Sequence, residues 1–323
     1  MSEADNRIQD WVENIFRGDV RAISRAITAV ENRDSDSHAL LKLLFPRTGK
    51  AALIGITGPA GAGKSTLVDG LAALMRNQGH SVGILAIDPS SPFSGGAILG
   101  DRIRMQTHAA GSGIYIRSMA TRGALGGISS ATLDAAMVLD AAGKDFILIE
   151  TVGVGQDEVE IIRLADITLV LSIPGTGDDV QAFKAGIMEI ADIFVLNKSD
   201  LPGADRVEQE IRSLLSLAPE SQAWRPEIIR TVATRQEGLE NLWQAITRYL
   251  AFSRERGIFD DRRREHWQAR IMSLLQSRLL DQLLRNALPD GALSEYAAQV
   301  ASRQSDPYEI TDLILKQSGH LNP

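Results

Sequence analysis

The sequence predicts an α/β fold: a largely parallel sheet flanked by helices, preceded by a helical segment and followed by a helical extension. Three observations predict it. Apolar residues recur at helical spacing in residues 1–46, short β-branched runs alternate with helical stretches in residues 47–256, and the β pattern is absent from residues 257–323. Near-continuous apolar runs are typical of strands buried on both faces, and helices between them imply right-handed crossovers in a parallel sheet. These three ranges are the expected domains.

The N-terminal segment is predicted to be helical from a single apolar stripe. Its members Ile8, Trp11, Val12, Ile15 and Phe16 follow the period of an α-helix. Residues 47–50 then break the pattern before the first strand. The seven strands predicted in the central domain are residues 51–57, 81–88, 113–119, 145–152, 166–173, 191–197 and 226–233.

The C-terminal extension is predicted to begin with one long helix over residues 262–288. A stripe of apolar side chains at steps of four is widened by three further leucines beyond the narrow seam of a coiled coil. The stripe consists of Trp267, Ile271, Leu275, Leu279 and Leu283, with Leu274, Leu280 and Leu284 beside it. Two interpretations fit this pattern. The helix packs against the sheet domain of its own chain, or it forms a subunit interface.

Composition and charge exclude several classes of function. The 323 residues include 41 acidic and 34 basic side chains, and an acidic chain without a basic block is a poor nucleic-acid binder. The chain has no cysteine, which excludes disulfides, thiolate metal sites and cysteine nucleophiles, and its five histidines lie far apart in sequence. It begins without a secretory signal and has no run of about 18 apolar residues. We therefore expect a cytoplasmic protein with neither a nucleic-acid nor a membrane partner.

A phosphate-binding loop is predicted where the first strand meets the next helix. The run GPAGAGKST (58–66) matches G-x-x-x-x-G-K-[ST] in the strand–helix context that this motif requires. Its glycines let backbone N–H groups turn toward phosphate oxygens, and the helix N-terminus adds partial positive charge. Lys64 would reach the β- and γ-phosphates, and the Ser65 hydroxyl would bind Mg²⁺. The predicted phosphate-binding residues are Gly58, Gly61, Ala62, Gly63, Lys64, Ser65 and Thr66.

The sequence NKSD (197–200) indicates which base the nucleotide carries. N-K-x-D at the carboxyl end of a strand reads guanine: the Asp200 carboxylate would accept hydrogen bonds from N1–H and the 2-amino group, which adenine does not offer. Asn197 would brace the neighbouring loop, and the stem of Lys198 would lie against the base. The Ala233 N–H, after the last strand, is a candidate to meet guanine O6. The predicted ligands are therefore GTP and GDP rather than ATP.

Carboxylates at strand ends are the candidates for holding Mg²⁺. Glu150 ends the run DFILIE (145–150) and is expected to hold the ion together with Ser65. Asp88, at the end of the second strand, and Asp101 are further candidates, directly or through water. For these two a helix cap or a solvated loop is the alternative, whereas a charge at the end of an apolar strand such as Glu150 needs a partner.

The residues expected to act in catalysis are Lys64, Glu150, Gly153 and Lys184. Gly153 would place its backbone N–H near the γ-phosphate. No glutamine directly follows it, so no water-positioning side chain is identifiable there and intrinsic hydrolysis is expected to be slow. Lys184 is the only cation in the Gly- and Asp-rich loop 174–186, which makes it the candidate for relaying the nucleotide state to a partner. The alternative is an ordinary solvated lysine.

Together these motifs resemble one family, the MeaB/ArgK-type GTPases. The resemblance covers nearly the whole chain and rests on GPAGAGKST, DPSSPFSGGAILGDRIRM (88–105), ETVGVGQ (150–156), PGTGDDVQ (174–181), NKSD and the helical tail. It implies a GTPase chaperone that gates cofactor loading and protects or rescues an adenosylcobalamin-dependent acyl-CoA mutase, above all methylmalonyl-CoA mutase. It also implies a homodimer formed through the C-terminal helices, and contacts at three groups of residues: phosphate at Gly61, Gly63, Lys64 and Ser65, Mg²⁺ at Asp88, Asp101 and Glu150, and guanine at Asn197, Lys198 and Asp200.

Two other classes of GTPase are the alternatives. A metallochaperone delivering nickel or cobalt would need cysteine or clustered histidine, and the sequence has neither. A GTPase acting on ribosomes or RNA would need a basic face or an added RNA-binding module, and neither is found in the sequence.

Overall fold

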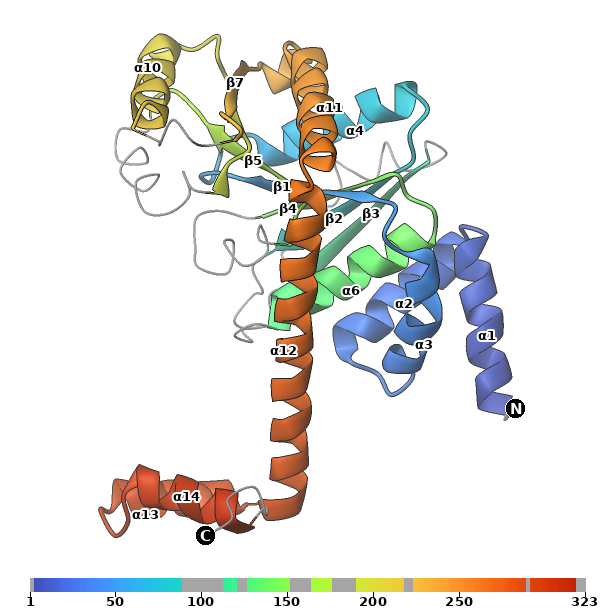
Figure 1. Ribbon diagram of the computed structural model, residues 1–323, viewed down its shortest axis with the longest axis vertical. Helices are drawn as coiled ribbons and strands as arrows, with labels where there is room; N and C mark the ends of the chain where they lie inside the picture. The colour runs from blue at the N-terminus through green and yellow to red at the C-terminus, as the bar shows by residue number, and fades with distance from the viewer. Residues whose placement is uncertain are drawn as a thin grey trace. The chain divides into compact units, whose positions relative to one another are not determined.

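A computed structural model describes residues 3–88, 113–120, 127–151, 164–175, 190–217, 223–288 and 291–317 (Figure 1). The chain forms two compact units, Met1–Arg263 and Arg264–Pro323. The first contains the sheet, and the described part of the second is helical.

The sheet has seven strands, all parallel, in the order β3-β2-β4-β1-β5-β6-β7. The strands are β1 (Ala52–Thr57), β2 (Val82–Asp88), β3 (Ile114–Ala120), β4 (Phe146–Glu150), β5 (Ile167–Ser172), β6 (Ile193–Leu196) and β7 (Glu227–Arg230). Each of the seven strands predicted from the sequence is present, and the parallel arrangement is confirmed. Burial explains the pattern, because β5 and β6 are buried along their whole length and β1 and β4 nearly so.

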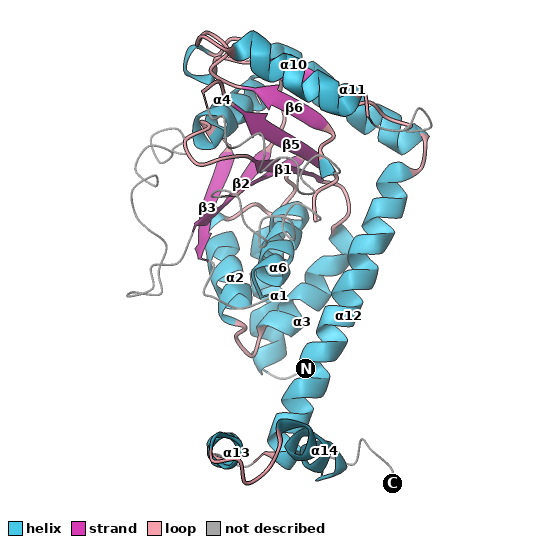
Figure 2. Ribbon diagram, turned by 90° about the vertical axis from the view of Figure 1, so that its left-hand side faces the viewer, coloured by secondary structure: helices cyan, strands magenta, loops and turns pink. Residues whose placement is uncertain are grey.

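Helices cover both faces of this sheet (Figure 2). On one face α4 (Lys64–Asn77) and α11 (Leu239–Glu255) enclose the largest apolar core, which includes Ile54, Leu71 and Ile246. On the other face α6 (Gly127–Ala141) packs together with the N-terminal helices, and α10 (Ala204–Leu215) covers the β5–β6 side. Both faces of the sheet are therefore covered by helices, as the alternation of strands and helices in the sequence predicts.

The N-terminal segment is helical, as predicted. It consists of α1 (Glu3–Phe16), α2 (Val20–Asn32) and α3 (Ser37–Leu44), followed by the short 3-10 helix η1 (Phe45–Arg47). Asp19 caps α2 by accepting the Ala22 N–H at 2.6 Å, which satisfies a donor that the first turn cannot pair internally. The buried faces of these helices, with Ile15, Ile23 and Leu40, join the core below α6.

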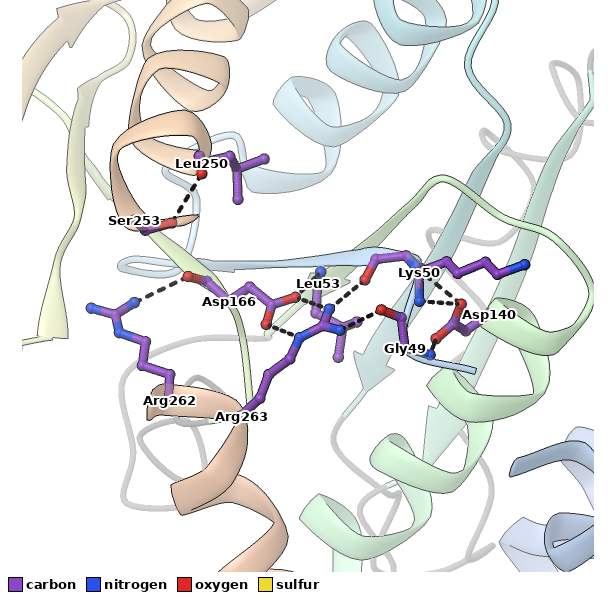
Figure 3. A network of polar contacts seen from close by, with 10 residues as sticks. Gly49, Lys50, Leu53, Asp140, Asp166, Leu250, Ser253, Arg262 and Arg263 are labelled. Atoms are coloured by element: carbon purple, nitrogen blue, oxygen red, sulfur yellow. Dashed lines mark hydrogen bonds and ion pairs between the residues drawn. The ribbon is translucent and has the colours of Figure 1, made fainter. Parts of the chain in front are cut away.

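Two arginines in the second turn of α12 (Ile258–Ala287) tie this helix to the amino-terminal edge of the sheet (Figure 3). Arg263 donates from Nε and Nη2 to the two carboxylate oxygens of Asp166, each at 2.9 Å. Arg262 donates from Nη1 and Nη2 to the two carboxylate oxygens of Asp192, each at 2.8 Å. Asp166 also accepts the Leu53 N–H at 2.9 Å. Because each buried carboxylate meets a planar guanidinium with two bonds, this α12 anchor holds the amino ends of β5 and β6 together.

The second unit contains most of α12, then α13 (Ala292–Ala301) and α14 (Pro307–Gln317). Ala287, Ile310 and Ile314 form a small core of its own. The long helix is confirmed, but it begins at Ile258 rather than residue 262. Acidic side chains in its first turn favour that earlier start because they complement the positive end of the helix dipole. In the described ranges no helix is both long and apolar enough to cross a membrane.

Candidate functional site

The topology brings the predicted site residues that the structure describes to the carboxyl-terminal edge of the sheet. β1 lies at the centre, between β4 and β5, so the chain leaves its carboxyl end at the point where the strand order changes direction. Crevices for ligands form at such points in parallel α/β sheets. Ile56 of β1 stands opposite Glu150 of β4, which sets that carboxylate beside the loop that follows β1.

The loop 58–63 has the backbone shape that its glycines permit. Gly58 and Gly63 have φ angles of 147° and 86°, which side chains other than glycine rarely adopt. Space is also limiting: a Cβ on Gly58 would stand 2.6 Å from the Leu171 oxygen, and one on Gly63 would stand 2.5 Å from Asn197 Nδ2. The two glycines therefore let β5 and Asn197 approach the loop closely.

Lys64 and Ala62 lie inside this loop region. The Lys64 ammonium donates to the Gly58 oxygen at 2.8 Å and to the Pro59 oxygen at 3.0 Å, and only 6% of the residue is exposed. Ala62 is fully buried, and its N–H donates to the Pro59 oxygen at 3.1 Å. A buried cation therefore sits at the first turn of α4, bonded to the loop that the sequence predicts to hold phosphates.

A hydroxyl and a carboxylate meet next to Lys64. Ser65 donates from Oγ to Glu150 Oε1 at 2.5 Å, and Glu150 is buried. Thr151, the residue after Glu150, donates its N–H to the Ile56 oxygen of β1 at 3.1 Å, which holds the end of β4 against β1. Oxygen donors of this kind are the ones that Mg²⁺ prefers, so the pair fits the predicted ion chemically. Thr66, the next residue, is exposed on the first turn of α4.

Asn197 connects the loop to the guanine motif. Its Nδ2 donates to the Ala62 oxygen at 2.8 Å, and its Oδ1 accepts from Thr231 Oγ1 and from the Ala233 N–H, both at 3.1 Å. Only 2% of Asn197 is exposed. The buried side-chain amide of Asn197 therefore joins three segments that are far apart in the sequence, through its donor and its acceptor. The Ala233 N–H, which the sequence assigns to guanine O6, donates to Asn197 Oδ1 in this structure.

Lys198 and Asp200 lie on the outer side of the same motif. Lys198 has a φ of 53° and donates from Nζ to the Gly61 oxygen at 2.9 Å, so its stem passes over the phosphate-binding loop. Asp200 Oδ2 lies 3.2 Å from Arg235 Nη2, where the two side chains form an ion pair. A cation therefore lies beside the carboxylate that the sequence assigns to the base.

Three predicted residues lie outside the described ranges: Asp101, Gly153 and Lys184. Asp88 ends β2 as predicted, with only its backbone described. Within the described ranges, the structure brings together the loop 58–66, Glu150, the motif 197–200 and Ala233. Sequence reasoning missed Thr231 and Arg235, which contact the guanine motif from the loop after β7. Neither residue type carries a signal for that role, since only the fold brings them to Asn197 and Asp200.

Comparisons with known proteins agree with this geometry. Residues 23–287 match the family described as "Methylmalonyl Co-A mutase-associated GTPase MeaB". A protein of Pyrococcus abyssi named as a GTPase is 45% identical over 313 residues, covering 96% of each chain. The mouse protein "Methylmalonic aciduria type A homolog, mitochondrial" is 32% identical over 335 residues, covering 98% of this chain and 81% of its own. The crystal structure of an LAO/AO transport system kinase matches with a TM-score of 0.72 and 25% identity, over 99% of this chain and 98% of that one.

Proposed function

Because the chain belongs to the MeaB family of methylmalonyl-CoA mutase-associated GTPases, we propose that it binds and slowly hydrolyses GTP. We propose further that this cycle assists the assembly, cofactor loading and protection of an adenosylcobalamin-dependent acyl-CoA mutase, methylmalonyl-CoA mutase in particular. The observation that carries the nucleotide assignment is Asn197, whose buried amide joins the phosphate-binding loop to the guanine motif. The family description and the mouse relative support the mutase partner.

The nucleotide roles follow from the chemistry of the described residues. The ammonium of Lys64 leaves two loop carbonyls and binds the β- and γ-phosphates when a nucleotide arrives, because phosphate oxygens carry the stronger charge. Asp200 accepts from guanine N1–H and the 2-amino group, and the aliphatic stem of Lys198 covers one face of the base. Gly153 and Lys184 keep their proposed roles at the γ-phosphate and in signalling to the partner.

Mg²⁺ belongs to the proposed site as well. Ser65 and Glu150 would hold it, with Asp88 and Asp101 as the further carboxylates assigned from the sequence. When bound, the ion neutralises charge on the β- and γ-phosphate oxygens. The hydrogen bond between Ser65 and Glu150 shows that the fold places these two oxygen atoms side by side.

The guanine assignment is tested by Asp200→Asn. We expect GDP affinity to fall about 10- to 100-fold, because the amide offers one acceptor where the base presents two donors, and water partly compensates at this half-exposed position. Xanthosine diphosphate should gain affinity, since its additional carbonyl accepts from the new amide. Calorimetry with GDP, ADP and xanthosine diphosphate measures all three. Equal affinity of the unaltered protein for ADP and GDP would contradict the assignment.

The mutase partner is tested by measuring GTP turnover with and without purified methylmalonyl-CoA mutase. We expect the mutase to raise turnover several-fold, because intrinsic hydrolysis lacks a water-positioning glutamine after Gly153. Mutase heated to inactivation is the control. Unchanged turnover, together with separate elution of the two proteins in size-exclusion chromatography, would argue against this partner.

We also propose a homodimer formed through the C-terminal helices. In the single chain Leu275 and Leu279 are 50% and 51% exposed, and with Ile271 they form an apolar stripe at steps of four along α12. Leu275→Glu combined with Leu279→Glu is expected to convert a dimer to a monomer in light scattering. Ser277→Glu is the matched control, because a residue two positions on lies on the other side of the helix. A dimer that survives the double substitution would place the interface elsewhere.

A further inference from the structure

We propose that Arg235 is a positioning residue for the base: it holds the Asp200 carboxylate in the orientation that guanine requires. This inference rests on the proposed function, since it assigns a role at the guanine site. The sequence motif ends at Asp200, and Arg235 comes from a different loop, after β7. The contact between them joins Asp200 Oδ2 to Arg235 Nη2 at 3.2 Å.

The loop that carries Arg235 is tightly closed. Val232 and Glu237 exchange both backbone hydrogen bonds across its base, at 3.0 Å and 3.3 Å. Between them, residues 233–235 form the 3-10 turn η2, and Gln236 takes a left-handed φ of 59°. A short loop with both ends bonded has few alternative conformations, so its side chains start from a fixed backbone.

The same loop already holds the other end of the guanine motif. Its Ala233 N–H donates to Asn197 Oδ1 at 3.1 Å, and the preceding Thr231 oxygen accepts from the Ser199 N–H and from Ser199 Oγ, also at 3.1 Å. Arg235 adds the contact at Asp200. Residues 197, 199 and 200 are therefore each bound by the segment 231–235, and Arg235 supplies the contact at the carboxylate.

Charge and geometry explain what this contact does. A carboxylate on a half-exposed side chain rotates between several rotamers in water, whereas two hydrogen bonds to the edge of a planar base need one orientation. The ion pair joins Arg235 Nη2 to Oδ2, and a carboxylate has about four lone-pair positions, so Oδ1 and the second lone pair of Oδ2 can accept from guanine. Glu237 Oε1 lies 4.0 Å from Arg235 Nη1, so a second carboxylate stands near the guanidinium.

The test compares Arg235→Gln, Arg235→Lys and the unaltered full-length protein in calorimetric titrations with GDP and with inosine diphosphate, which lacks the 2-amino group. An exposed ion pair is worth little, so we expect Arg235→Gln to weaken GDP about three- to fivefold and Arg235→Lys to recover part of that loss. The preference for GDP over inosine diphosphate should shrink, which a loss of stability alone would not cause. Arg230→Gln is the matched control: it removes a surface arginine paired with Asp205 and Glu208, away from the motif.

A double-substitution cycle separates this inference from the proposed function. In the Asp200→Asn background Arg235 has no carboxylate to hold, so adding Arg235→Gln should leave xanthosine diphosphate affinity unchanged. If the unaltered protein fails to bind GDP, the proposed function is wrong. If it binds GDP and Asp200→Asn weakens that binding, but Arg235→Gln leaves GDP affinity and the inosine preference unchanged, only the role of Arg235 is wrong. Tighter GDP binding by Arg235→Gln would also overturn it, because Arg235 would then compete with the base.

Discussion

Lys64→Ala is expected to weaken GTP binding about 100- to 1,000-fold and GDP binding about 10- to 100-fold. Lys64 is the buried cation of the phosphate-binding loop, and a charge-assisted hydrogen bond contributes about 1.5–3 kcal/mol. Two such bonds, to the β- and γ-phosphates of GTP, account for the larger loss at about 1.4 kcal/mol for each factor of ten. GDP has no γ-phosphate, so only one of the two bonds is lost with it. The measurement is isothermal titration with each nucleotide in the presence of Mg²⁺.

The control for Lys64→Ala is Lys50→Ala, which removes an exposed lysine near the start of β1. It should leave nucleotide affinity unchanged, although the overall charge changes equally. Because Lys64 also bonds to the Gly58 and Pro59 oxygens, thermal unfolding must be followed in both variants to separate loss of the loop from loss of the cation. If Lys64→Ala remains folded and binds GDP as tightly as the unaltered protein, the phosphates bind elsewhere.

Most of the fold could be predicted because the signals are local. The apolar runs of β5 and β6 are buried along their whole length, so they are visible as continuous hydrophobic segments. The ends of the strands are less predictable: the sequence predicts a strand over residues 191–197, whereas β6 spans Ile193–Leu196. Asp192 lies outside that strand because its carboxylate accepts the Thr168 N–H at 2.8 Å and pairs with Arg262, and neither partner is close in sequence.

The candidate site likewise contains some residues that the sequence predicts and others that only the fold reveals. The phosphate-binding loop and the guanine motif are runs of consecutive residues, since a loop that wraps a ligand must be continuous, and their sequences alone indicate the chemistry. Arg235 contacts Asp200 only because β7 pairs with β6 and carries the following loop to the motif. The α12 anchor could not be predicted from the sequence either. Arg262 lies 70 residues from Asp192, and Arg263 lies 97 residues from Asp166. An arginine run at the start of a helix normally indicates a solvated surface.

Asp166→Ala is expected to destabilise the sheet-containing unit by about 3–5 kcal/mol. The side chain of Asp166 is only 2% exposed, and its two oxygens accept from Arg263 Nε and Nη2 and from the Leu53 N–H. Burial by itself would lower the pKa of Arg263, but the bonds to Asp166 raise it above its ordinary value. Removing the carboxylate therefore leaves a desolvated guanidinium that stays charged without its counter-ion. At about 2–4 °C for each kcal/mol, the melting temperature should fall by about 6–20 °C in calorimetry.

Two further variants separate this buried pair from an ordinary surface charge. Asp36→Ala breaks the exposed Arg7–Asp36 pair and should cost at most about 1 kcal/mol. Adding Arg263→Ala to Asp166→Ala should cost less than the sum of the two single substitutions, because the second change removes the charge that the first leaves unpaired. GDP affinity at the opposite edge of the sheet should persist below the lowered melting temperature. A loss for Asp166→Ala no greater than that for Asp36→Ala would mean that the start of α12 is held to the sheet by its apolar contacts, with Phe259 in the core, rather than by the arginine pair.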